Sequence, residues 1–459
     1  MPEIDPSRLA RLLSEEQATY TQRHHSSKAL YDEATHLFGH VPMTWMNMWS
    51  GGFPLYFERA TGNRIVDVDE HEYIDFALGD TGAMAGHSPP ATVRAVERRI
   101  NELGGITTML PTAEAAWVGA ELARRFGLPL WSFTLSATDA NRWAIRLARL
   151  VTEKPKIVCF SYSYHGSVDE TFAIAADGAT ISRPGNAGPP VALDVTTRAV
   201  AWNDLEALET ALAHRDVAVI LTEPALTNIG IVLPDPDFHA EMRALASRYG
   251  ALLMIDETHT LSAGPGGATA AWGLRPDMLI IGKSIGGGIP SGAYGITADV
   301  AAAVEARTAS GEADLIDVGG VGGTLAGNGL SVAAMRATLA EVLTDDAFEH
   351  MITLATRFTD GVRSVLTTYD VPWSITQLGA RAEYRFTPQP PRDGESSAQA
   401  ADPELDNYLH LALCNRGILM TPFHNMALMC PTTSTEDVDR HTAAFGEVVG
   451  ALVSEGRPA

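Results

Sequence analysis

The sequence has few cysteines, no excess of basic residues and no long apolar run, and each absence excludes a class of protein. Its three cysteines, Cys159, Cys414 and Cys430, lie far apart without CxxC spacing, so neither a disulfide framework nor a zinc or other metal site is expected. The formal net charge of -23 at pH 7 argues against a nucleic-acid partner, because phosphate contacts require a basic face.

No segment of the sequence is expected to enter or cross a membrane. No apolar stretch is long enough to span a bilayer. The N-terminal segment MPEIDPSRLARLLSEEQ is charged and lacks the apolar core of a signal peptide. Together with cysteines that show no disulfide pattern, these features favour a cytoplasmic protein.

What the sequence contains is the composition of an ordinary globular protein. Hydrophobic residues make up 46% and charged residues 19% of its 459 residues, which is enough for two or three domains around a large core. The negative charge favours solubility and leaves small-molecule substrates open, since a basic pocket can exist on an acidic protein. No internal repeat is visible.

The hydrophobic pattern predicts an α/β protein in three parts. Residues 1–78 predict an amphipathic helix over 5–38 and then short strands, with a turn at Thr61-Gly62-Asn63. Residues 79–329 alternate short apolar runs with helical segments, which is typical of βαβ units and a parallel sheet. The pattern of residues 330–459 predicts a smaller part that contains both helices and strands.

Within the last part, an Ala-rich helix is expected after Asn328. Strands are expected around residues 380–386 and 417–423. The stretch 387–404 is rich in proline and serine, and we expect it to be an exposed loop.

Lys283 stands at the end of an apolar run, just before Gly286, Gly287 and Gly288, and the preceding run delivers Asp256 in the same way. Parallel strands present their carboxyl ends at one edge of a sheet, so we expect the amine and the acid to meet there. This pair suggests pyridoxal phosphate (PLP): the amine would form a Schiff base, and the acid would keep the pyridine nitrogen protonated. The alternative is an exposed lysine before a flexible loop.

The segment SATDANRWAIRLAR joins a small polar turn to a helix. Ser136, Ala137 and Thr138 could present backbone amides and hydroxyls to a phosphate at the positive end of the helix dipole. The same residues also suit a simple N-cap, and the sequence leaves both readings open.

Further polar or aromatic residues follow other predicted strands. Tyr164 could stack on a cofactor ring or belong to the core. Asn228, which follows Glu223, could bond a phenolic oxygen or cap a turn. Thr324, in GGTLAGN, could bind phosphate or lie in an interdomain turn.

These segments, taken in order from about Val41 to Asp439, resemble the class III aminotransferases of fold type I. The resemblance is to the branch that contains glutamate-1-semialdehyde aminomutase and the β-amino-acid and amine transaminases. It is carried by FPLYFERATGNRIVDVDEHEYIDF, GHSPP, SATDANRWAIRLAR, YHG, EP with Asn228, Asp256-Glu257, GKSIGGGIPSGAYG and GGTLAGN.

The resemblance implies a large PLP-binding domain with a mostly parallel seven-stranded type of sheet, and a smaller α+β domain made by the two chain ends. Lys283 and Asp256 would be catalytic, with Lys283 shuttling a proton between the substrate and the cofactor. Ala137 and Thr138 would bind phosphate, joined by Thr324 of the other subunit, so a homodimer with shared sites is implied. The other implied cofactor contacts are Ser136, Tyr164, Glu223, Asn228 and Thr258.

The sequence departs from the family pattern near the expected substrate. Relatives carry an arginine in the loop before the FPL strand, whereas this chain has Trp45 and Trp49 with two methionines, which would wall an apolar pocket or pack a core or interface. On the C-terminal strand, Arg381 or Arg385 could bind a carboxylate, and we choose Arg381. His165 is a further expected substrate contact.

His259 follows Thr258 where the family usually has Asp-Glu-Val, and it would either line the site or fill a polar pocket. We expect a cytoplasmic PLP-dependent transaminase that moves an amino group from a hydrophobic amine or β-amino acid to a small α-keto acid, through pyridoxamine phosphate. The alternatives are an isomerase like glutamate-1-semialdehyde 2,1-aminomutase and a PLP-dependent lyase or racemase.

Overall fold

The computed structural model describes residues 4–453. The chain divides into two compact units. One unit contains the chain up to Ser88, Asp346–Pro390 and the chain from Gln399; the other contains Pro89–Asp345 and Pro391–Ala398.

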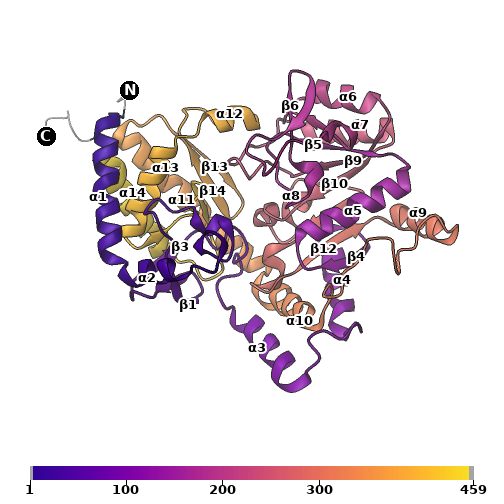
Figure 1. The fold of residues 1–459 in the computed structure, drawn as a ribbon, viewed down its shortest axis with the longest axis horizontal. Helices are drawn as coiled ribbons and strands as arrows, with labels where there is room; N and C mark the ends of the chain where they lie inside the picture. The colour runs from indigo at the N-terminus through magenta and orange to yellow at the C-terminus, as the bar shows by residue number, and fades with distance from the viewer. Residues whose placement is uncertain (1–3, 454–459) are drawn as a thin grey trace. The chain divides into compact units, whose positions relative to one another are not determined.

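The second unit is built on a seven-stranded sheet with the order β4-β12-β11-β10-β9-β5-β8 (Figure 1). Strands β11, β10, β9, β5 and β8 run parallel, and β12 is antiparallel to both of its neighbours. The mostly parallel seven-stranded sheet predicted above is therefore confirmed. Its strands are β4 (Leu130–Thr134), β5 (Lys156–Phe160), β8 (Thr197–Val200), β9 (Val217–Thr222), β10 (Leu252–Asp256), β11 (Met278–Ile281) and β12 (Gly292–Ile296).

Both faces of this sheet are buried. Alternate residues of a strand point to opposite faces, and in β10 Met254 packs in one apolar cluster whereas Leu253 and Ile255 pack in another. Helix α5 (Ala137–Thr152) packs against β4, β9, β11 and β12, while α6 (Leu205–Ala213) packs on β8 and α7 (Phe238–Tyr249) on β10. Burial on two faces explains why the strands read as continuous apolar runs.

The remaining elements of this unit surround the sheet. Helices α3 and α4 pack against α10, α4 also packs against α8, and α9 packs against α5. Their bounds are α3 (Pro90–Arg98), α4 (Ala113–Phe126), α8 (Gly267–Ala271), α9 (Ala298–Ala309), α10 (Gly329–Ala337), α12 (Gly394–Gln399), and the hairpin β6 (Ala173–Ala176) and β7 (Ala179–Ser182).

The first unit is built from both ends of the chain, as expected. Its four-stranded sheet has the order β1-β2-β3-β15, in which β15 from the C-terminal part pairs in parallel with β3. A second sheet has the order β13-β14-β16. The elements are β1 (Phe57–Thr61), β2 (Arg64–Asp67), β3 (Glu72–Asp75), β13 (Ser374–Leu378), β14 (Arg381–Arg385), β15 (Ile418–Leu419), β16 (Met426–Leu428), α1 (Pro6–Arg23), α2 (His25–Glu33), α11 (Asp345–Tyr369), α13 (Pro403–Asn415) and α14 (Thr435–Val453).

The turn at Thr61-Gly62-Asn63 is confirmed between β1 and β2, with Gly62 at a φ of 59°. The single helix over 5–38 is wrong, because the chain leaves the helical conformation at His24. The His24 ring joins a buried hydrogen-bond network instead: Nδ1 lies 2.7 Å from the Tyr20 carbonyl oxygen and Nε2 lies 2.8 Å from the Tyr73 hydroxyl. Within residues 4–453, no helix is both long and apolar enough to cross a bilayer.

The prediction of an exposed loop over 387–404 is wrong for the middle of this stretch. Part of it forms α12, where Gly394 and Ser397 are buried. The Ser397 hydroxyl donates to the carbonyl oxygen of Ile229, and Arg392 forms an ion pair with Asp235. Ser397 of α12 therefore makes an internal hydrogen bond, whereas the residues on either side of this helix, 388–390 and 401–404, are exposed as predicted.

His441 is buried in an aromatic cluster of the first unit. Its ring centroid lies 4.3 Å from that of Phe358 and 5.7 Å from that of Phe445. Neither ring nitrogen has a hydrogen-bond partner among the described residues. Burial lowers the pKa of His441 to about 3, so the folded protein holds a neutral imidazole with two unsatisfied nitrogens.

Replacing His441 with phenylalanine is expected to stabilise the protein, because an apolar ring removes both unsatisfied nitrogens. The folded-state pKa of His441 lies below the unfolded one, so the wild type loses stability as pH falls from the unfolded value towards about 3. When the pH falls from about 7 to about 5, the free energy of unfolding of the wild type should drop by up to about 2 kcal/mol more than that of H441F. Thermal unfolding at both pH values measures this. H36Q, at an exposed histidine, is the control; equal acid sensitivity of H441F and wild type would contradict the prediction.

Candidate PLP site

Five expected functional residues of the second unit lie on segments that follow parallel strands. Asp256 is the last residue of β10, and Lys283 follows β11, its hydrogen-bonded neighbour. Tyr164 and His165 follow β5, and Glu223 follows β9. The carboxyl ends of parallel strands meet at one edge of the sheet, where ligands bind in open α/β folds.

Asp256 is buried and held by donors on three sides. Its Oδ2 accepts hydrogen bonds from Asn141 Nδ2 at 2.9 Å and pairs with His165 Nδ1 at 3.0 Å. Its Oδ1 accepts from the Thr258 N–H at 3.1 Å. Burial acts to raise the pKa of Asp256, but the His165 contact and the other hydrogen bonds together hold it below its ordinary value, so the carboxylate is ionised.

The structure places His165, an expected substrate contact, against Asp256. Its side chain is buried, and its Nε2 has no hydrogen-bond partner among the described residues. The sequence reasoning missed Asn141, which bonds the same carboxylate oxygen. Its signal was helical spacing, because Asn141 lies one turn beyond Ala137 on α5.

Lys283 is half-buried, and its backbone lies in the left-handed region with a φ of 51°. A lysine rarely adopts this conformation, and such strain is concentrated at functional sites. Its Nζ lies 2.8 Å from Nε2 of His259. The exposed-lysine alternative therefore does not hold, and His259 lines the surroundings of the amine.

The N-terminus of α5 has the simple N-cap that the sequence allowed, and its geometry is also compatible with a bound phosphate. Ser136 is the N-cap, and its Oγ accepts from the Asp139 N–H at 3.2 Å. The N–H groups of Ala137 and Thr138 belong to the first turn and have no acceptor within the helix. They point with the positive end of the helix dipole, as a bound phosphate requires.

Two glycines let neighbouring loops approach this helix end closely. A Cβ atom on Gly282, the residue before Lys283, would lie 2.9 Å from the Ala137 nitrogen. A Cβ atom on Gly166 would lie 1.9 Å from Thr138 Oγ1, which accepts a hydrogen bond from the Ser167 N–H at 3.2 Å. The approach joins the Tyr164 loop and the Lys283 segment to the helix N-terminus.

Replacing Gly166 with alanine is expected to weaken PLP binding by about 10-fold or more, because the new methyl group must displace Thr138 in addition to straining a positive φ. Gly178 provides a matched control, since it has the same φ of 76° as Gly166 but no atom within 4 Å of an added Cβ. PLP titration of the apoenzymes measures the effect. Equal PLP affinities of G166A and G178A would contradict it.

Glu223 holds the Tyr164 loop in place. Its Oε1 accepts from the Tyr164 N–H at 3.1 Å, and its Oε2 accepts from the Thr227 hydroxyl. The side chain is buried, and burial raises the pKa of Glu223 above its ordinary value. Tyr164 is half-buried, with its ring edge-on to that of Phe172.

The other expected cofactor contacts, Asn228, Thr258 and Thr324, differ in how deeply they are buried. Asn228 is half-buried in the loop after β9. Thr258 is buried, and its Oγ1 has no hydrogen-bond partner among the described residues. Thr324 lies in an exposed loop before α10.

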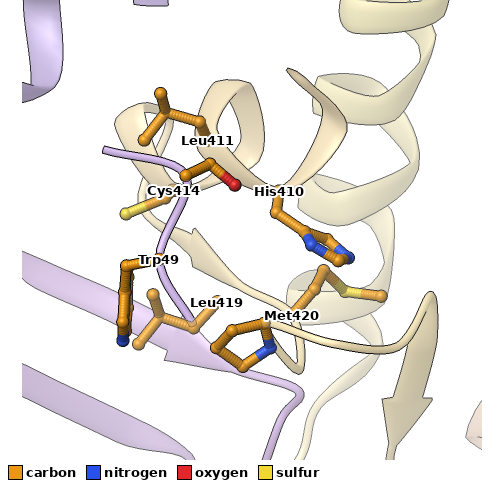
Figure 2. A pocket seen from close by; sticks show the side chains of 8 residues that line it. Trp49, His410, Leu411, Cys414, Leu419 and Met420 are labelled. Carbon is orange, nitrogen blue, oxygen red and sulfur yellow. The ribbon is translucent and has the colours of Figure 1, made fainter. Parts of the chain in front are cut away.

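The three remaining candidates, Trp45, Trp49 and Arg381, belong to the first unit. Trp45 is 44% exposed and lies edge-on to Phe423. Trp49 packs beside the cluster around Tyr20, and Figure 2 shows it lining a small pocket with His410, Leu411, Cys414, Leu419 and Met420. Arg381 is fully buried on β14, the central strand of its sheet.

The donor set of the second unit fits PLP. A helix N-terminus with free amides suits the phosphate, an ionised buried carboxylate suits the pyridinium nitrogen, and a half-buried amine suits the aldehyde. The orphaned Thr258 Oγ1, beside Asp256, adds a polar group that nothing in the described chain satisfies.

Comparison with known proteins agrees with this fit. The model of the family described as Aminotransferase class-III matches residues 45–449. The chain is 33% identical over 434 residues to glutamate-1-semialdehyde 2,1-aminomutase of Sorangium cellulosum (strain So ce56), covering 93% of this chain and 96% of that one.

Solved structures give the same picture. A glutamate-1-semialdehyde-aminomutase from Pseudomonas aeruginosa PAO1 superposes with a TM-score of 0.94 and 46% identity, over 98% of this chain and 99% of that one. A lysine-to-alanine variant of it is known in complex with PMP. An omega-transaminase from Sphaerobacter thermophilus has a TM-score of 0.83 and 28% identity, over 93% of this chain and 97% of that one.

The fold and the site define a PLP-dependent transferase of fold type I. The chain belongs to the class III aminotransferase family, and pyridoxal 5'-phosphate is its cofactor.

Proposed function

We propose that this enzyme moves an amino group between neighbouring carbons of one small substrate, as a 2,1-aminomutase of the glutamate-1-semialdehyde type. The likeness to the Pseudomonas aminomutase, at 46% identity over 98% of the chain, is the observation that carries this proposal. The Sorangium relative supports it independently. These relatives favour the alternative named above over the transaminase of hydrophobic amines.

In this proposal the residues of the second unit bind PLP and handle one proton. Lys283 is the amine that attaches the cofactor and then acts as base and acid at the substrate carbons, while Asp256 keeps the ring nitrogen protonated. When bound, PLP supplies an electron sink that makes the carbon–hydrogen bond next to the amino group acidic. His165 and Asn141 orient Asp256. The further proposed cofactor contacts are Ser136, Ala137, Thr138, Tyr164, Glu223, Asn228 and Thr258.

A transaminase remains a second candidate because of one observation. The loop over residues 42–52 contains no arginine, and Trp45 offers an exposed aromatic surface instead. Such a surface suits an aryl or alkyl group better than a carboxylate. We keep Arg381 as the candidate carboxylate contact of either reaction.

Turnover of glutamate-1-semialdehyde without added keto acid tests the first candidate. Formation of 5-aminolevulinate, followed by chromatography, is the expected result. The second candidate is tested in parallel by absorbance of the loaded enzyme after β-phenylalanine, 1-phenylethylamine or alanine is added alone. A spectral change with one donor that a keto acid reverses, together with no 5-aminolevulinate, would replace the aminomutase by a transaminase.

We further propose a cytoplasmic homodimer in which Thr324 completes the phosphate site of the other subunit. Large apolar side chains stand exposed near Thr324 in sequence, including Ile316 at 96% exposure, and on the adjoining segment, including Met109 at 77%. The Gly329 N–H bonds the Ile106 carbonyl, which ties the two segments together. Exposed patches of this kind mark protein interfaces. Light scattering that gives the mass of one chain would contradict the dimer.

A further inference from the structure

His259 contacts the amine of Lys283, and none of the roles implied by the family resemblance falls on it. The two side chains come from neighbouring parallel strands: His259 lies just beyond β10 and Lys283 just beyond β11. The distance of 2.8 Å between His259 Nε2 and Lys283 Nζ is that of a hydrogen bond. The imidazole is buried, whereas the lysine is half-buried.

The backbone on the histidine side of this contact is fixed by Glu257. The Glu257 carboxylate accepts from the Thr260 hydroxyl at 2.5 Å and from the Ala268 N–H at 3.1 Å, and its carbonyl accepts from the Leu261 N–H at 2.9 Å. The Ser262 hydroxyl donates to the His259 carbonyl at 3.2 Å. The imidazole is thus carried by a braced turn, so its position does not depend on a mobile loop.

The lysine side is equally constrained. Lys283 adopts a positive φ, and Gly282 before it lies close against the start of α5. Both partners of the hydrogen bond therefore stand on backbone that allows little movement. The hydrogen bond between His259 and Lys283 is therefore set by the backbone of both segments.

The hydrogen bond between Lys283 and His259 restricts the protonation states of the two side chains. An ammonium group has donors only, and an imidazolium ring has donors only, so the two charged forms cannot share a hydrogen bond. The contact requires one proton on the line between Nζ and Nε2. It is satisfied by an ammonium that donates to a neutral imidazole, by an imidazolium that donates to a neutral amine, or by a neutral amine paired with a neutral imidazole.

We propose that His259 is a positioning residue for Lys283. It directs one N–H bond of the amine to Nε2 and so fixes the direction of the amine at the end of β11. It also holds the proton that Lys283 gains, until that proton is returned. This inference rests on the proposed function, in which Lys283 is the base.

The proton balance closes within the pair and the substrate. A carbon–hydrogen bond breaks as an N–H bond forms on Nζ, and the electron pair stays on the carbon side. The proton then lies between Nζ and Nε2, and the reverse transfer to the second carbon breaks the N–H bond. No oxidant, reductant or second acid is required, and exchange with water is slowed because the imidazole occupies the place of a solvent acceptor.

The first test uses the apoenzyme. Stopped-flow absorbance gives the rate at which Lys283 captures added PLP covalently. H259L should slow capture by about 10-fold, the cost of one lost hydrogen bond that orients the amine. H259Q, whose amide reaches the Nε2 position, should restore most of the rate, whereas the shorter H259N should not. Capture at the wild-type rate by a folded H259L would overturn the proposal.

The second test follows the proton itself. Substrate carrying deuterium on the carbon that bears the amino group is converted in ordinary water by the loaded enzyme. The wild type is expected to return part of the deuterium to the product, and H259L and H259N should lose that transfer to solvent exchange. Equal deuterium retention in all three proteins would count against a proton-holding role and leave His259 as packing.

The two proposals fail in different ways. If the wild-type apoenzyme captures no PLP at Lys283, the proposed function itself is wrong. If the wild type and H259L capture PLP equally well, only the inference about His259 is wrong. Melting temperatures of all variants accompany both tests, and H259Q separates loss of the hydrogen bond from loss of folding.

Discussion

Replacing Lys283 with alanine is expected to abolish turnover, with a loss of about 10⁴-fold or more. The substitution removes the covalent attachment of PLP and the proton acceptor in one step. Water is a poor substitute, since it offers no nucleophilic amine at the end of β11. The measurements are kcat with glutamate-1-semialdehyde and the amount of cofactor fixed irreversibly by borohydride.

The composition of the chain makes this experiment unusually clear. The sequence contains only four lysines: Lys28, Lys154, Lys156 and Lys283. Peptide mapping after borohydride treatment should therefore find cofactor on Lys283 alone. K156A is the matched control, because Lys156 on β5 pairs with Asp216 at 3.4 Å and should keep full activity. Borohydride-fixed cofactor in K283A would show that another residue carries the attachment.

Parts of the fold could be predicted because single segments determine them. Strand β9 is buried at every position from Val217 to Thr222. A continuous apolar run of this length predicts a strand that is covered on both faces. The turn at Gly62 was visible for a similar reason, since a positive φ favours glycine.

The errors arose where distant residues decide the local conformation. The break between α1 and α2 depends on Tyr73, which bonds His24 from β3. Helix α12 depends on Ile229, whose carbonyl accepts from Ser397. Neither partner is close in sequence, so hydrophobic periodicity could not reveal the contact.

In the candidate site, too, some residues could be predicted from single segments and others depend on distant contacts. Lys283 and Asp256 were predictable because each ends an apolar run, and strand order brings them to one edge. The contacts of Asn141 and His259 depend on side-chain directions that spacing only suggests. His165 shows the difference most plainly, since its position after β5 was foreseen but its partner, Asp256, was not.

Replacing Asp256 with asparagine is expected to lower kcat by about 10²–10³-fold while the fold is retained. Two causes act together. The variant loses the negative charge that keeps the ring nitrogen protonated. Its amide also directs N–H donors at groups that now donate to the carboxylate, namely Asn141 Nδ2 or the Thr258 N–H.

The pH dependence gives this prediction a second readout. The pKa of Asp256 in the folded protein is held below the ordinary value of 3.8, so the carboxylate is charged at any pH above 3.8. It loses this charge, and its contribution to stability, only as the pH falls through the lower pKa of the folded state. The activity profile of the wild type between about pH 5 and pH 8 should therefore carry no step from Asp256. D256N should lower kcat across this whole range.

Asp277 provides the matched control for D256N. It lies just before β11, at the end opposite Lys283, and its Oδ2 accepts from the Leu253 N–H at 2.7 Å and from Arg243 at 2.6 Å. D277N removes a comparable hydrogen-bonded carboxylate from the same strand pair, so it should lower the melting temperature and leave the absorbance of bound PLP unchanged. D256N should change that absorbance. Equal kcat values for D256N and the wild type would mean that the buried carboxylate only braces the site, and that the ring nitrogen is controlled elsewhere.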